Sequence, residues 1–158
     1  MSPAGASLVG PYVRRETMIS VVINVALSLA FFLLVFGRTD PVPVWGLGKY
    51  AFDFIPQSFM IALMSTVVPG ILAIQRRKAR LVERVEAPSR LPRKLMPRAL
   101  FVALLAVLLG AGLVALVLAA ARIDMIAWTP ALVFKLLYGG ALAALVTPPT
   151  LRAALHHP

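Results

Sequence analysis

Four long apolar blocks are the feature that most limits what this chain can fold into. They cover about residues 17–36, 51–74, 99–121 and 128–147. A helix needs about 20 consecutive, mostly apolar residues to cross the hydrocarbon core of a bilayer, and each block has this length. The first block is too long for the apolar part of a cleaved signal peptide. The sequence therefore predicts four transmembrane helices.

The composition agrees with a membrane protein and disagrees with a soluble one. Of the 158 residues, 60% are hydrophobic and 14% are charged, whereas soluble domains have about 45–50% apolar and about 25% charged residues. We expect an all-α fold in one membrane domain, residues 1–158. Its four helices would form two tandem hairpins, residues 17–74 and 99–147, packed as a four-helix bundle.

The segments between the blocks differ strongly in charge. Segment 75–98 carries nine Lys or Arg and two Asp or Glu, a net charge of +7, whereas loop 37–50 has two basic residues and loop 122–127 has one. Short loops rich in Lys and Arg stay in the cytoplasm. With four spans, segment 75–98 and both termini then lie on the cytoplasmic side.

The net charge of +10 for the whole chain has the same explanation, because most of the excess lies in segment 75–98. A soluble protein with this charge would suggest nucleic acid. Here we expect anionic lipid headgroups and no nucleic-acid partner. The basic residues expected at the headgroups are Arg76, Arg77, Lys78, Arg80, Arg93 and Lys94.

The two halves of the chain resemble each other. Each has an apolar block, a loop that opens with Arg-x-Asp at residues 38–40 or 122–124, and a second block followed by Pro and Arg. A shift of 80 residues places Phe54 on Phe134. Both halves would enter the membrane from the cytoplasm, so the pattern favours a parallel internal repeat about an axis along the membrane normal. Chance matching of apolar residues is the alternative.

With a Pro and then an Arg closing each two-helix unit, the chain resembles small bacterial inner-membrane proteins grouped as a domain of unknown function, the DUF2798 type. The resemblance covers most of the chain. It implies a multi-pass protein of the bacterial inner (plasma) membrane. That family has no established activity, so the resemblance implies no site residues, and stretch 53–59 matches no pattern of the family.

Ser20, Asn24 and Ser28 recur every four residues in the first block, so they share one face of the predicted helix. Polar side chains of this kind hydrogen-bond between helices in membrane proteins, with a contribution of about 0.6 kcal/mol each. We favour this interpretation. The alternative is a polar lining for a small solute.

Three further polar side chains interrupt the later blocks: Asp53, Gln57 and Lys135. Counted back from the proline that follows each block, Asp53 and Lys135 lie at similar depth. Ionisable groups inside a span are unfavourable, and they pair with each other or mark a pathway. We therefore expect an ion pair between the two halves. Snorkelling of both residues to the outer surface and a transport role are the alternatives.

The third block has no charged side chain but many small residues, among them Gly110. Small residues allow helices to approach closely, so we expect the third helix to pack tightly on the fourth, where Gly140 has the same character. A homodimer seam or a contact with another membrane protein is the alternative. Pro148 and Pro149 are expected to end the fourth helix.

Signatures of catalysis are missing from the sequence. The two histidines, His156 and His157, are adjacent at the end of the chain, there is no cysteine, and no P-loop, GxGxxG or HExxH motif occurs. We expect no enzymatic activity, no catalytic or metal-binding residue and no cofactor. The favoured function is a non-enzymatic accessory or structural membrane component, and a small dimeric transporter or channel is the alternative.

Overall fold

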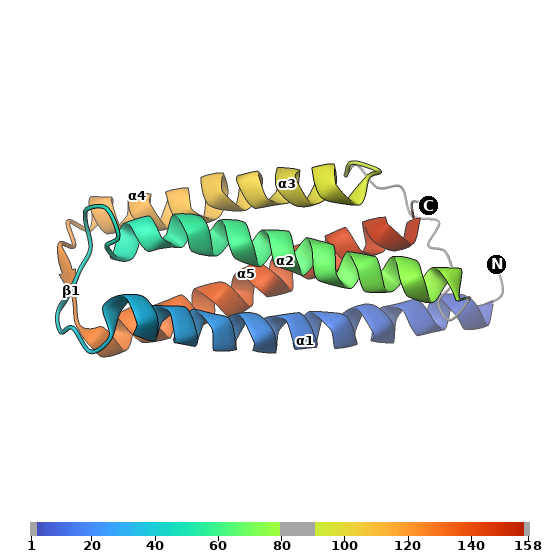
Figure 1. Cartoon of the computed structure of the whole chain (residues 1–158), viewed down its shortest axis with the longest axis horizontal. Coiled ribbons are helices and arrows are strands. Elements are labelled where there is room, and N and C mark those ends of the chain that lie inside the picture. Colours follow the sequence, from blue (N-terminus) through green and yellow to red (C-terminus); the bar gives the residue numbers. More distant parts are fainter. Residues whose placement is uncertain (1–2, 80–90, 157–158) are drawn as a thin grey trace.

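A computed structural model describes residues 3–79 and 91–156 of the chain. Four helical rods run roughly along one long axis (Figure 1). They are α1 (Pro3–Phe36), α2 (Tyr50–Lys78), a third rod built from α3 (Leu95–Ala106), the π-helical turn η1 (Val107–Ala111) and α4 (Gly112–Ala120), and α5 (Trp128–His156). All four rods are long and apolar enough to cross a membrane. The predicted all-α fold with four transmembrane helices is confirmed.

The rods pack in an interlaced order. Helices α2 and α5 lie against each other, α1 packs mainly on α5, and the third rod packs mainly on α2. The two rods of each hairpin touch only sparsely, so the first rod of each half packs on the second rod of the other half. The expected tight packing of the third helix on the fourth is therefore wrong. Its closest partner is α2.

Helices α2 and α5 run in parallel, and two of their contacts join residues that are 80 apart in the chain. The rings of Phe54 and Phe134 lie 5.9 Å apart between centroids. One turn further along, the hydroxyl oxygens of Ser58 and Tyr138 are 2.5 Å apart. This offset equals the shift that aligns the two halves of the sequence.

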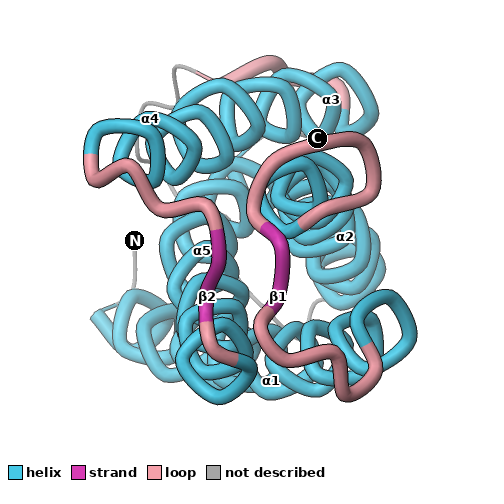
Figure 2. Tube along the Cα trace, turned by 90° about the vertical axis from the view of Figure 1, so that its left-hand side faces the viewer, coloured by secondary structure: helices cyan, strands magenta, loops and turns pink. Residues whose placement is uncertain are grey.

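A short ribbon joins the two loops at one end of the bundle, which we call the loop end. Strand β1 (Val42–Pro43) pairs antiparallel with β2 (Met125–Ile126), and Val42 lies opposite Ile126 (Figure 2). The Trp128 indole N–H also donates to the Gly37 carbonyl at 2.8 Å. Both termini lie at the opposite end of the bundle, the terminal end (Figure 1).

Two helix boundaries differ from the sequence-based prediction. Helix α5 continues through the two prolines to His156, and α1 begins at Pro3 instead of after the polar lead. One packing contact holds the two extensions together, because Val13 of α1 is buried with Leu151 and Leu155 of α5. Tertiary burial of this kind outweighs the local preference of proline to end a helix.

The third rod is interrupted at its middle by η1, a turn of π-helix. Gly110 lies within this turn, and a Cβ atom placed on it would overlap the Tyr138 hydroxyl of α5. Single π-helical turns inside α-helices are insertions that shift the helix face locally. Here the turn brings a side-chain-free surface to the Ser58 and Tyr138 pair.

Candidate functional site

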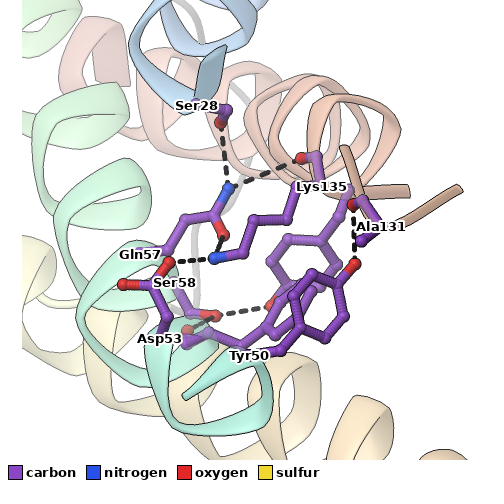
Figure 3. Close-up of polar contacts among 9 residues, drawn as sticks. Ser28, Tyr50, Asp53, Gln57, Ser58, Ala131 and Lys135 are labelled. Carbon is purple, nitrogen blue, oxygen red and sulfur yellow. Dashed lines mark hydrogen bonds and ion pairs between the residues drawn. The ribbon is translucent and has the colours of Figure 1, made fainter. Parts of the chain in front are cut away.

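An ion pair joins α2 and α5 near the loop end of the bundle. Lys135 Nζ donates to Asp53 Oδ2 and, at 2.9 Å, to Gln57 Oε1 (Figure 3). Only 2% of the Lys135 side chain is exposed, against 18% of the Asp53 side chain. The predicted pairing is confirmed, and Lys135 does not snorkel to the surface.

Aromatic rings enclose the Lys135 ammonium on its remaining sides. Its Nζ lies 4.5 Å from the ring centroid of Phe54, 5.7 Å from that of Tyr50 and 5.9 Å from that of Phe36. A ring face attracts a cation within about 6 Å. The ammonium is therefore held by two oxygen acceptors and by aromatic faces, and its charged partner among the described residues is the Asp53 carboxylate.

Gln57 extends the ion pair to a third helix. Its Nε2 donates to Ser28 Oγ of α1 at 2.9 Å and lies 3.5 Å from the Lys135 carbonyl oxygen (Figure 3). One connected network thus ties α1, α2 and α5 together. Each hydrogen bond between transmembrane helices contributes about 0.6 kcal/mol on average, so the network stabilises the arrangement of the helices.

A second polar layer lies deeper in the bundle, one to two turns from Ser28. Ser20 Oγ is 3.1 Å from both Ser65 Oγ of α2 and Thr147 Oγ1 of α5. Asn24 Nδ2 donates to Ser65 Oγ at 3.2 Å and to the Ser20 carbonyl at 2.8 Å. The polar face predicted for the first helix is confirmed as a buried face that bonds to other helices. Its partners Ser65 and Thr147 were missed, although both are hydroxyl residues within apolar blocks.

Two adjacent glycines make the close approach of α1 and α5 feasible. A Cβ atom on Gly139 would overlap Ser28 Oγ, and one on Gly140 would lie 3.0 Å from Val25 Cγ2. The predicted role of Gly140 in close packing is thus correct, but the helix that approaches it is α1.

A cavity of about 150 Å³ lies between α1 and α2, beside the ion pair. The polar residues in its lining are Asn24, Ser28, Asp53, Gln57 and Lys135. It exists because α1 and α2 make few direct contacts and leave a groove above α5. This is the place where the predicted site residues come together.

The terminal end of the bundle holds a second ion pair. Arg76 of α2 donates to Glu16 Oε1 of α1 at 3.0 Å and covers the Tyr12 ring at 5.1 Å from its centroid. Arg76 was predicted at the lipid headgroups, but its ion pair and its cation–π contact are both with α1. Glu16 was missed, since nothing in the polar lead distinguishes it.

Arg98, like Lys135, is a buried basic residue. It donates to the carbonyl oxygens of Pro92 and Arg93, both at 2.9 Å, and to that of Thr150 at 3.3 Å. It fixes the start of α3 to α5. Sequence analysis assigned it no role because it lies within a run of basic residues.

The remaining basic residues predicted at the lipid headgroups differ in exposure and in how much of each residue the structure describes. Arg93 and Lys94 are exposed. Arg77 takes part in an interaction. Arg80 lies outside the described residues, and the described part of residue 78 is its backbone. Within 3–79 and 91–156, no group of three His, Cys, Asp or Glu could hold a metal ion.

The chain was also compared with known proteins. No protein-family model matches it, and no curated protein or solved structure is significantly similar. The resemblance to the tandem two-helix family therefore stays a prediction.

Proposed function

We propose that this chain is a non-enzymatic accessory or structural component of the bacterial inner membrane that acts through its helix surfaces. The observation that carries the proposal is the state of the buried charges. Lys135, Asp53, Glu16 and Arg98 are each bonded to a different helix or segment of the same chain. Charges used in this way hold a bundle together.

A flux measurement tests this proposal against the transport alternative. The purified chain would be placed in vesicles of phosphatidylethanolamine and phosphatidylglycerol that contain a pH-sensitive dye, and a pH gradient would be applied. We expect proton flux equal to that of protein-free vesicles. Flux above that level that disappears in a double variant, Asp53→Leu with Lys135→Met, would contradict the proposal.

A small transporter or channel is the second candidate, and the cavity beside Asp53 favours it. Carriers bind solutes at sites near the middle of the membrane, between repeats. A homodimer or another membrane protein is the partner that either function would need. The bare apolar outer face of the third rod would serve as the contact surface.

We also propose that both termini face the cytoplasm. Both termini and the described ends of segment 75–98 lie at one end of the bundle (Figure 1), where most of the Lys and Arg are found. There Arg93 and Lys94 would contact anionic headgroups, each attracted by about 1 kcal/mol. The composition carries no argument for nucleic acid, and we propose none as a partner.

Cysteine labelling tests this orientation, because the chain has no native cysteine. Leu47 lies in the loop at the loop end and is 85% exposed, and Arg93 is exposed at the terminal end. We expect a membrane-impermeant maleimide to label Leu47→Cys in intact spheroplasts and to label Arg93→Cys only after lysis. The reverse pattern would contradict the proposed orientation.

A further inference from the structure

We propose that the groove between α1 and α2 binds the uncharged, hydrogen-bond-donating head of an amphipathic molecule that resides in the bilayer. The groove combines two kinds of surface. Its lining is mostly apolar, but the polar side chains of Asn24, Ser28 and Asp53 reach its floor. Its rim is apolar and faces outward, with Leu27, Phe31, Met60 and Met64.

The polar side chains of the groove, which form its floor, offer acceptors that have no donor within the described residues. Within the described residues, Asp53 Oδ2 is bonded to Lys135, while no donor reaches Asp53 Oδ1. The Asn24 amide nitrogen donates to the Ser20 carbonyl and to Ser65 Oγ. Asn24 Oδ1, like Asp53 Oδ1, accepts no hydrogen bond from the described residues. Acceptors left without donors at low polarity are unfavourable. A ligand that donates hydrogen bonds removes this deficit.

The charge balance selects a neutral ligand. The Asp53 carboxylate is already neutralised by Lys135, which is enclosed by Gln57 and aromatic rings. A third charge of either sign would be buried without a partner, and such a charge is strongly unfavourable in a membrane interior. Hydroxyl or amide donors satisfy the free oxygens without adding charge.

The volume and position of the groove fit a small polar head with a chain attached. A volume of about 150 Å³ equals that of roughly five water molecules, close to a glyceryl group. Asp53 lies three residues inside the start of α2, which is about 5 Å along the axis. The head of the ligand would thus lie about one helical turn inside the loop end, and its acyl chain would extend along the apolar rim into the bilayer. Water alone could donate hydrogen bonds to the floor, but it would leave the apolar rim without an apolar partner.

Photolabelling of the full chain in phosphatidylcholine vesicles tests this inference. The probe is a monoacylglycerol with a diazirine near the head, and the matched probes are a fatty amine and a fatty acid of the same chain length. We expect the monoacylglycerol to label peptides that contain Leu27, Met60 or Met64. Labelling should be at least about fivefold stronger than with either charged probe, the equivalent of one ordinary hydrogen bond.

Two variants and one control sharpen the test. Met64→Trp narrows the rim without touching the ion pair, and Asn24→Leu removes one acceptor, so each should lower labelling by about fivefold. Leu109→Trp, on the rim of the apolar groove between the third rod and α5, should leave it unchanged. Equal labelling by all three probes, or no effect of Met64→Trp, would overturn the inference. Displacement by free glycerol would overturn the assignment to a bilayer-resident molecule.

Discussion

At the scale of single residues, Lys135 is a buried charge with a closely fitted environment. Its ammonium is bonded to Asp53 and Gln57 and lies against the Phe54 ring. A buried ion pair adds little net stability compared with an apolar pair of similar volume, but loss of one partner leaves an uncompensated charge. The two residues therefore have to be changed together.

This environment gives a prediction with an opposite outcome for single and double variants. Asp53→Leu alone should lower the free energy of unfolding by about 3–5 kcal/mol, because it leaves Lys135 unpaired. Adding Lys135→Met should restore most of the loss. Thermal unfolding in detergent, followed by size-exclusion chromatography, measures both. Exposed Asp124→Asn is the control and should stay within about 0.5 kcal/mol of the parent. No rescue by the second change would contradict this account.

An exchange of the two residues is a weaker test than the apolar pair. An acid at position 135 would face the negative ring surfaces of Phe54 and Tyr50, which attract a cation and repel an anion. Complementary charge in the sequence indicates the pair, but the rings that surround it fix which partner belongs on which helix.

At the scale of the helices, close contacts depend on glycines at two places. Gly139 lets α5 approach Ser28 of α1, and Gly110 leaves room on the third rod for the Tyr138 hydroxyl of α5. The small residues were visible in the sequence. Their partner helices were not, because every rod is apolar on most faces and small residues specify how close a neighbour comes without specifying which neighbour it is.

The crossing at Gly139 can be tested with a matched pair of glycine substitutions. Gly139→Ala should destabilise the bundle by about 1–3 kcal/mol, since its Cβ overlaps Ser28 Oγ. Gly112→Ala places its Cβ no closer than 4.0 Å to the neighbouring atoms considered and should stabilise α4 by up to about 1 kcal/mol. Melting temperatures in one detergent compare the two.

The cause of the Gly139→Ala effect is itself checkable. Ser28→Ala removes the overlapping hydroxyl, so the double variant should recover part of the lost stability. Equal melting temperatures of Gly139→Ala and Gly112→Ala would show that the crossing is not close in solution.

Much of the fold and part of the site followed from the sequence. Span number, the Asp53–Lys135 pair and the buried polar face of α1 came from length, depth and spacing, which are local quantities. The interlaced packing, the passage of α5 through Pro148 and Pro149, and the two-residue ribbon did not, because each depends on burial against distant segments. The role of Arg98 was not predicted, because in the sequence it resembles the basic residues around it.

At the scale of the whole molecule, the interlaced packing has two-fold character. α1 relates to α5 as the third rod relates to α2, and Phe54 meets its equivalent Phe134 at the interface. Val42 and Ile126, which occupy equivalent places after the two Arg-x-Asp motifs, face each other in the ribbon. We propose on this basis that the two halves derive from one duplicated hairpin that originally paired with a second copy.

The proposed duplication predicts that the halves assemble from separate chains. Residues 1–86 and 87–158, expressed together, should copurify through a tag on one half, and each expressed alone should be degraded or aggregate. The reason is that each half alone leaves Asp53 or Lys135 without its partner. Copurification should fail with Gly139→Leu, which blocks the approach of α1 to α5. Stable accumulation of single halves would contradict the prediction.

The interlaced order also has a consequence for biogenesis. Asp53 and Lys135 are 82 residues apart in the chain, which corresponds to about 4–16 s of synthesis at roughly 5–20 residues per second. The first hairpin is therefore complete before α5, which packs on both of its helices, has been made. We expect Asp53 to stay without its buried partner until α5 is in place.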